Sequence, residues 1–103
     1  MNDKILVVIK RVGEEPTVDH VENTLKGLQE AVGGHLEVLQ FTSDVAFLVD
    51  EEGILKNKPH NTTLLNCPIV GTIVAVGTKG ENFTNLRSST IPTVLRLLKG
   101  ELT

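Results

Sequence analysis

The sequence contains no tryptophan, no tyrosine and only three phenylalanines, Phe41, Phe47 and Phe83. Proteins that bind single-stranded nucleic acid usually stack the bases on aromatic rings, so the common form of that site is missing. The chain also carries a net charge of −3, whereas binding to duplex nucleic acid relies on an excess of Lys and Arg. Duplex nucleic acid and anionic membranes are therefore not expected partners.

Cysteine is also scarce, because Cys67 is the single one in the chain. An intrachain disulfide and a multi-thiolate metal site are thus excluded, which favours a reducing, cytoplasmic setting. Cys67 precedes an apolar run, and we expect a buried structural thiol there. The histidines His20, His35 and His60 lack the close spacing of a helical metal pair, so no metal is predicted. The apolar stretch Ile5–Ile9 is too short for a signal-peptide core or a membrane span.

What the sequence does contain is the composition of an ordinary globular domain. It has 103 residues, of which 40% are hydrophobic and 22% are charged. This composition argues against disorder and coiled coil, and the length suits one core. No repeat or linker divides the chain, so residues 1–103 are expected to form a single domain.

The clearest local pattern is a helix that begins near Asn23 and stops at Gly33. Leu25, Leu28 and Val32 recur at spacings of three and four, which places them on one helical face. Asn is a good N-cap, and glycine readily adopts the left-handed conformation that ends a helix.

Apolar runs predict the strands, and a second stripe predicts the last helix. The expected strands are Lys4–Lys10, Thr17–Asp19, His35–Phe41, Val45–Val49 and Ile69–Val76, with a short helix over Asn61–Leu65. The pattern from Leu36 to Val49 predicts a hairpin. Thr90 should cap the last helix, whose stripe is Ile91, Val94, Leu95, Leu98 and Leu102. The element order predicts an α+β fold with a mainly antiparallel sheet of about four to six strands and two main helices packed on one face.

Lys79 and the glycines around it form the preferred binding element. Residues 71–80 read GTIVAVGTKG, and successive backbone N–H groups in a glycine-rich loop can surround an anion. The spacing differs from that of a Walker loop, and a plain glycine turn is the alternative interpretation. The expected ligand-binding residues are Gly77, Lys79, Gly80, Asn82, Thr84, Asn61 and Lys58.

The acidic segment Asp50, Glu51 and Glu52 lacks the alternating oxygen ligands of a calcium loop and is expected to be a solvated hairpin turn. As an alternative, the same carboxylates could meet a basic protein surface. His35 and Glu37 share a strand face, but no nucleophile with an oriented base accompanies them. No catalytic residue and no cofactor are therefore predicted.

A set of short motifs is spread over the chain from about Ile5 to Leu98. They are Leu28-Gln29, Val32-Gly33-Gly34 with Glu37, Glu51-Glu52-Gly53, Asn61, Val70-Gly71 and Gly80-Glu81-Asn82-Phe83-Thr84. In these motifs the chain resembles an uncharacterised family of small proteins found in bacteriophages, plasmids and conjugative elements. The resemblance implies a cytoplasmic accessory protein of a mobile element, located in the host cytoplasm if a phage encodes it. It implies no established chemistry.

The glycine segment and the resemblance together favour a non-catalytic, counter-defence protein that sequesters a small phosphate-bearing host signal molecule. A homo-oligomer is expected, because a pocket is easily formed between subunits of this size. The alternative is an interaction protein that blocks a host enzyme through Asp50, Glu51 and Glu52. A small hydrolase or lyase using His35 and Glu37 is the third hypothesis.

Overall fold

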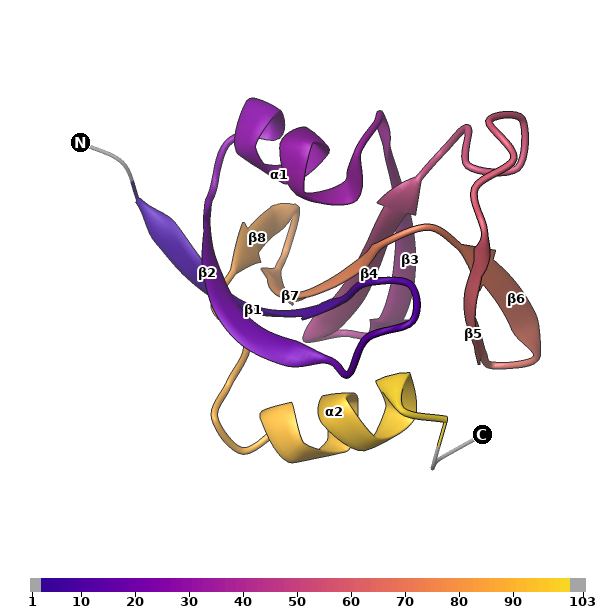
Figure 1. Ribbon diagram of the computed structural model, residues 1–103. Helices are drawn as coiled ribbons and strands as arrows, with labels where there is room; N and C mark the ends of the chain where they lie inside the picture. The colour runs from indigo at the N-terminus through magenta and orange to yellow at the C-terminus, as the bar shows by residue number, and fades with distance from the viewer. Residues whose placement is uncertain (1–2, 101–103) are drawn as a thin grey trace.

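The computed structural model describes residues 3–100 as a twisted sheet with a helix on either side and a separate hairpin (Figure 1). Every strand pairing in this range is antiparallel, so the expected α+β class with a mainly antiparallel sheet is confirmed. In chain order the elements are β1 (Lys4–Lys10), β2 (Thr17–Glu22), α1 (Leu25–Val32), β3 (Leu36–Thr42), β4 (Val45–Asp50), β5 (His60–Leu64), β6 (Cys67–Val70), β7 (Ile73–Lys79), β8 (Asn82–Thr84) and α2 (Ile91–Leu98).

The main sheet has six strands in the order β2-β1-β7-β4-β3, and β8 also pairs with β7. Strand β7 is central. Its first half pairs with β1 from Ile73 to Ala75, and its second half pairs with β8 from Gly77 to Lys79. Gly77 also pairs with Val45 of β4, so β8 and β1 share the other edge of β7. Strands β5 and β6 form a separate two-stranded sheet.

The central strands present apolar side chains on both faces of the sheet. Along β4, Phe47 packs in the cluster that includes Leu98 of α2, whereas Leu48 packs in the cluster that includes Val32 of α1. Successive residues of a strand point to opposite faces, so the two helices cover opposite faces (Figure 1). The expectation that both helices pack on one face is therefore wrong.

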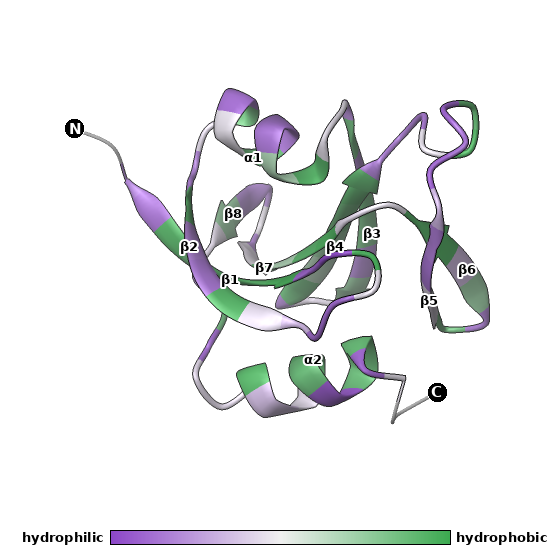
Figure 2. Ribbon diagram, viewed as in Figure 1, coloured by the Kyte–Doolittle hydropathy of each residue, from purple (hydrophilic) through white to green (hydrophobic). Residues whose placement is uncertain are grey.

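The apolar composition of the central strands explains this arrangement. All residues of β4 are buried, and β7 is buried from Ile73 to Thr78. A strand that is apolar on both sides needs a cover on each face. Figure 2 shows hydrophobic residues along these central strands and hydrophilic residues on much of α1.

Both helices begin and end close to the predicted residues. The N-cap of α1 is Thr24, whose Oγ1 accepts a hydrogen bond from Gly27 N–H at 3.0 Å, while the predicted cap Asn23 donates its side-chain amide to the Phe83 carbonyl. Gly33 ends α1 at φ 80°, as predicted. Thr90 stands at the predicted N-cap position of α2, but its backbone is helical (φ −91°, ψ −26°) and its side chain makes no capping hydrogen bond. Leu102, the last residue of the predicted stripe, lies outside the described residues. Neither helix within residues 3–100 has the length and hydrophobicity of a membrane span.

Predictions for the middle of the chain were less accurate. Asn61–Leu65 is not a helix, because His60–Leu64 forms β5, paired with β6. The apolar run Ile69–Val76 is divided between β6 and β7 by Gly71, which has φ 75°. Strand β7 then continues to Lys79 instead of stopping at Gly77. The tertiary pairing of each segment overrode its local pattern.

Candidate functional site

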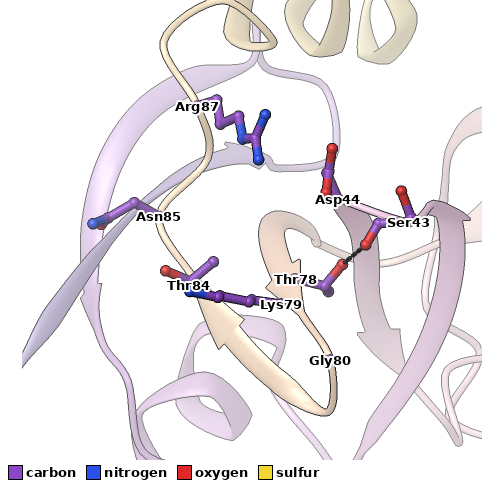
Figure 3. A pocket seen from close by; sticks show the side chains of 8 residues that line it. All are labelled: Ser43, Asp44, Thr78, Lys79, Gly80, Thr84, Asn85 and Arg87. Atoms are coloured by element: carbon purple, nitrogen blue, oxygen red, sulfur yellow. Dashed lines mark hydrogen bonds between the residues drawn. The ribbon is translucent and has the colours of Figure 1, made fainter.

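A depression of about 410 Å³ lies at the end of the sheet where β3 turns into β4 (Figure 3). Three segments form its walls: the β3–β4 turn, the β7–β8 hairpin and the chain leading to α2. The lining residues are Ser43, Asp44, Thr78, Lys79, Gly80, Thr84, Asn85 and Arg87. The volume falls in the range of small-molecule sites, about 300–1,000 Å³.

Thr78 fixes one wall of this depression to its neighbour. Its backbone N–H donates to the Asp44 carbonyl at 2.8 Å, and its hydroxyl donates to the Ser43 carbonyl at 2.9 Å. The Gln40 side-chain amide in turn donates to the Thr78 hydroxyl at 3.0 Å. Thr78 is 8% exposed, so these bonds are shielded from water. The wall is therefore preorganised, and the Thr78 hydroxyl is already engaged.

The charged side chains of the depression are not engaged in this way. Neither Lys79 nor Arg87 has a side-chain hydrogen bond or ion pair with any residue in the described part of the chain. Figure 3 shows Arg87 and Asp44 projecting from facing walls toward the same space. A depression with two available cations, one carboxylate and the Thr84 hydroxyl can bind an anion that also carries hydrogen-bond donors.

Asn85 and Gly77 support the site structurally. The Asn85 side-chain oxygen accepts a hydrogen bond from Leu6 N–H at 2.7 Å, and its side chain points away from the depression in Figure 3. Gly77 is buried in β7, and a Cβ there would collide with the Asn85 carbonyl oxygen where the chain passes after β8. Gly77 is thus explained by this close approach of two backbones.

The predicted anion-binding loop is a strand and a hairpin turn. Gly77 to Lys79 pair with β8, and only Gly80 and Glu81 connect the paired residues Lys79 and Asn82. Gly80 has φ 62° whereas Glu81 does not have a positive φ, as in a type II′ turn. The backbone N–H groups of Gly77 and Thr78 are therefore not gathered into an anion-binding loop.

The structure brings together only part of the predicted ligand-binding set. Lys79, Gly80 and Thr84 line the same depression. Asn82 lines a different depression, beside α1, together with Asn23, Leu28 and Glu81 among others. Lys58 and Asn61 lie near the far end of the sheet, where they serve the fold.

Asn61 connects three segments by hydrogen bonds. Its side-chain N–H groups donate to the Lys10 carbonyl at 2.7 Å and to the Gly71 carbonyl at 2.8 Å. Its side-chain oxygen accepts from Lys10 Nζ at 2.9 Å. Lys10 is only 8% exposed, so this amide satisfies a buried ammonium as well as two carbonyls.

Asp50 is the centre of an ion cluster at the same end of β4. Its carboxylate is completely buried, and Oδ2 lies 2.7 Å from Lys58 Nζ and 2.9 Å from Lys56 Nζ. The backbone N–H of Glu52 donates to Oδ1 at 2.9 Å. Burial alone would raise the pKa of Asp50, but these hydrogen bonds outweigh it and hold the pKa well below its ordinary value. The expectation of a solvated acidic turn is therefore wrong for Asp50.

The ion cluster also holds the end of α1. Lys58 Nζ donates to the Val32 carbonyl at 3.2 Å and to the Gly33 carbonyl at 3.1 Å. These are orphan carbonyls of a helix terminus, which cations stabilise. A Cβ on Gly34 would lie 2.5 Å from the Asp50 carboxylate, and one on Gly71 would lie 2.8 Å from Lys58 Cδ. Both glycines make room for the cluster.

The remaining candidates for chemistry are exposed. His35 and Glu37 lie on the surface at the start of β3, and the expectation that Cys67 is buried is wrong, since this free thiol is exposed. In residues 3–100, no group of three or more His, Cys, Asp or Glu side chains could hold a metal ion.

Five lining residues were missed by sequence reasoning, namely Ser43, Asp44, Thr78, Asn85 and Arg87. Ser43 and Asp44 read as an ordinary turn, and Arg87 stands in a polar segment before α2. Only the pairing of β4 with β7 brings that turn beside Lys79. The one local signal was an arginine in a loop close to the glycine segment.

The family model described as Domain of unknown function (DUF3846) matches residues 4–99. The match covers almost the whole chain, so the chain belongs to this family. No curated protein and no solved structure matches it.

Proposed function

We propose that this member of the DUF3846 family binds a small phosphate-bearing molecule in the depression beside Lys79 and does not turn it over. The observation that carries the proposal is the pair of cationic side chains, Lys79 and Arg87, on the walls of one depression, neither of which has a side-chain partner among residues 3–100. Charge-assisted hydrogen bonds from Lys and Arg are the strongest that proteins offer to phosphate. Thr84 would add a hydroxyl donor.

Asp44 restricts which phosphate-bearing molecules can bind in the depression. A carboxylate beside a phosphate repels it unless the ligand also presents N–H or O–H donors to that carboxylate. A nucleotide has this combination, with its phosphate directed to Lys79 and Arg87 and its sugar or base to Asp44. We therefore propose a nucleotide-like ligand over inorganic phosphate.

The residues that line the depression are consistent with a site that binds its ligand and does not react with it. The residues of the depression include no histidine and no cysteine. The hydroxyl groups of Ser43 and the threonines remain as potential nucleophiles. Within residues 3–100, the Ser43 hydroxyl has no base within hydrogen-bond distance. The proposed biological role, removal of a host signal during counter-defence in the host cytoplasm, rests on the resemblance to proteins of mobile elements.

A second candidate function, the blocking of a host enzyme, is favoured by a different surface. Ile54 and Leu55 follow the acidic segment and are 79% and 81% exposed, which is unusual for adjacent aliphatic side chains. Glu51 and Glu52 are exposed beside them, whereas Asp50 is buried and cannot face a partner. This contact surface would therefore consist of Glu51, Glu52, Ile54 and Leu55.

Native mass spectrometry tests the proposed function. The protein is incubated with a panel of adenine and guanine nucleotides and with a small-molecule extract of bacteria, and retained mass is read on the intact protein. The chain lacks Trp and Tyr, so a bound nucleotide also dominates its ultraviolet absorbance. We expect the native protein to retain a phosphate-bearing mass.

Variants assign the retained mass to the site. Lys79→Glu and Arg87→Glu should lose it, because each places a carboxylate where phosphate binds. Lys26→Glu is the matched control, since Lys26 is exposed on α1, outside the depression, and should retain the ligand. Lack of any retained phosphate compound, or equal retention by the Lys79 and Lys26 variants, would contradict the proposal. A retained host polypeptide that depends on Ile54 and Leu55 would support the second candidate.

A further inference from the structure

The strand β3 is an open edge of the main sheet. The strand order places β2 at one edge and β3 at the other, and among the strands that the structure describes β3 pairs with β4 alone (Figure 1). Proteins usually protect such an edge with lysine, proline, several charges or a β-bulge. Across Leu36–Thr42, β3 has no lysine and no proline, and its one charged residue is Glu37. Its one register shift against β4 lies at its end, between Gln40 and Thr42, so Leu36–Gln40 stays regular.

The direction of the backbone groups on β3 follows from its pairing with β4. The Glu51 N–H donates to the His35 carbonyl at 2.8 Å, so His35 faces β4. Backbone groups alternate between the two sides of an antiparallel strand. The N–H and C=O groups of Leu36, Val38 and Gln40 therefore point to the open edge.

We propose that two copies of this chain pair through their β3 strands, antiparallel and about a two-fold axis at Val38. In this register Val38 lies opposite Val38 of the second copy, and Leu36 lies opposite Gln40. Glu37 lies opposite Leu39, so the two Glu37 side chains do not face each other. The strand is thus complementary to itself in hydrogen bonding and in charge.

Val38 supports this choice of register. It is 46% exposed although it lies in the middle of a strand with high β propensity. Pairing at the two-fold axis would bring the two valines into contact and remove apolar surface from water. The dimer joins two sheets into one. None of the paired residues Leu36–Gln40 lines the proposed phosphate site, so the pairing does not rest on the proposed function.

The opposite edge is less suited to pairing with itself. The Asn23 N–H donates to the Asp3 carbonyl, so by alternation Val18, His20 and Glu22 of β2 point outward. Pairing of two β2 strands would be centred on two His20 side chains, with Asp19 opposite Val21 and Glu22 opposite Val18. Each β2 strand would bring two carboxylates to the dimer, whereas each β3 strand brings only Glu37.

The oligomeric state of the full chain tests the proposal. Light scattering after size exclusion, over a wide range of protein concentrations, should give a mass of twice 11.2 kDa at the higher concentrations. Val38→Lys should raise the dimer dissociation constant at least tenfold, because it opposes two ammonium groups at the axis. Val18→Lys is the matched control on β2, where the valine is 47% exposed, and should leave the dimer intact.

A monomer at every concentration, or equal dissociation by the two variants, would overturn the proposal. Circular dichroism checks that each variant folds. Amide hydrogen exchange gives a readout on the native protein, without mutation. Exchange at Leu36, Val38 and Gln40 should slow as concentration rises, while exchange at Val18 should stay constant. Concentration-independent exchange at Val38 would also refute the pairing.

Discussion

Replacing Asp50 by Asn should destabilise the protein strongly. The carboxylate is fully buried and is shared by Lys56, Lys58 and the Glu52 N–H. An amide of the same shape removes the charge and presents N–H groups to one or both lysines. Breaking a buried ion pair by removing one partner costs about 3–5 kcal/mol.

The position of the lysines sets the expected value within this range. Their side chains are 42% and 22% exposed for Lys56 and Lys58, so water can solvate them again after the substitution. We therefore expect a loss of about 2–3 kcal/mol in the free energy of unfolding, below the range for completely buried pairs. For a domain of this size, that loss lowers Tm by roughly 10–20 °C.

Urea unfolding followed by far-ultraviolet circular dichroism measures this loss, since the chain has no tryptophan or tyrosine for intrinsic fluorescence. Glu51→Gln is the matched control, because Glu51 is the exposed neighbouring carboxylate and should change stability by less than about 0.5 kcal/mol. An Asp50→Asn protein as stable as the native one, or an equal loss in both variants, would refute the role assigned to the cluster.

We also expect the difference in stability between the native protein and Asp50→Asn to depend on pH. The pKa of Asp50 is lowered on folding, so its contribution to stability is present above the unfolded pKa, about 4. As pH falls below that value, the unfolded chain binds a proton that the folded chain does not, and the contribution decreases. The difference between native protein and Asp50→Asn should therefore be constant near pH 7 and shrink below about pH 4. A difference that does not change with pH would contradict this assignment.

Two further substitutions test how the rest of the fold is held. Asn61→Ala should cost about 2–4 kcal/mol in urea unfolding, because it leaves two carbonyls without their donor and removes one of the two hydrogen-bond acceptors of the buried Lys10 ammonium; a loss below about 0.5 kcal/mol would contradict this. Gly77→Ala should lower Tm more than Gly80→Ala, since a Cβ at Gly77 meets backbone whereas Gly80 has open space and carries only the cost of φ 62°, about 1–2 kcal/mol. Equal Tm values for the two glycine variants would show that the backbone approach at Gly77 is not tight.

The sequence predicted the elements that depend on neighbouring residues. The end of α1 at Gly33, the start of α2 after Thr90 and the hairpin formed by β3 and β4 were all expected. Each depends on spacing or on the backbone preference of one residue, which a local pattern contains. The prediction for residues 60–64 was wrong because this strand depends on pairing with β6, which a local pattern does not contain.

The motifs that carry the family resemblance acquire a physical explanation only in the folded chain. Gly34 and Gly71 give space to the cluster of Asp50 and Lys58, and Asn61 ties β1 to the segment before β7. These positions serve the fold. The sequence predicted a short helix at Asn61 and a strand through Gly71, because the groups that these residues contact are distant along the chain.

The residues of the candidate site were likewise only partly predictable from the sequence. Lys79, Gly80 and Thr84 were identified from the sequence because they lie within one short hairpin, and the structure places them together. Asp44 and Arg87 join them from other segments, after β4 has paired with β7. The sequence alone therefore determined the helix ends, the main hairpin and a cluster of polar residues, which rest on local conformation. The tertiary structure decided that the helices lie on opposite faces, that Asp50 is buried and which side chains share a depression, because those outcomes depend on strand pairing and burial between distant residues.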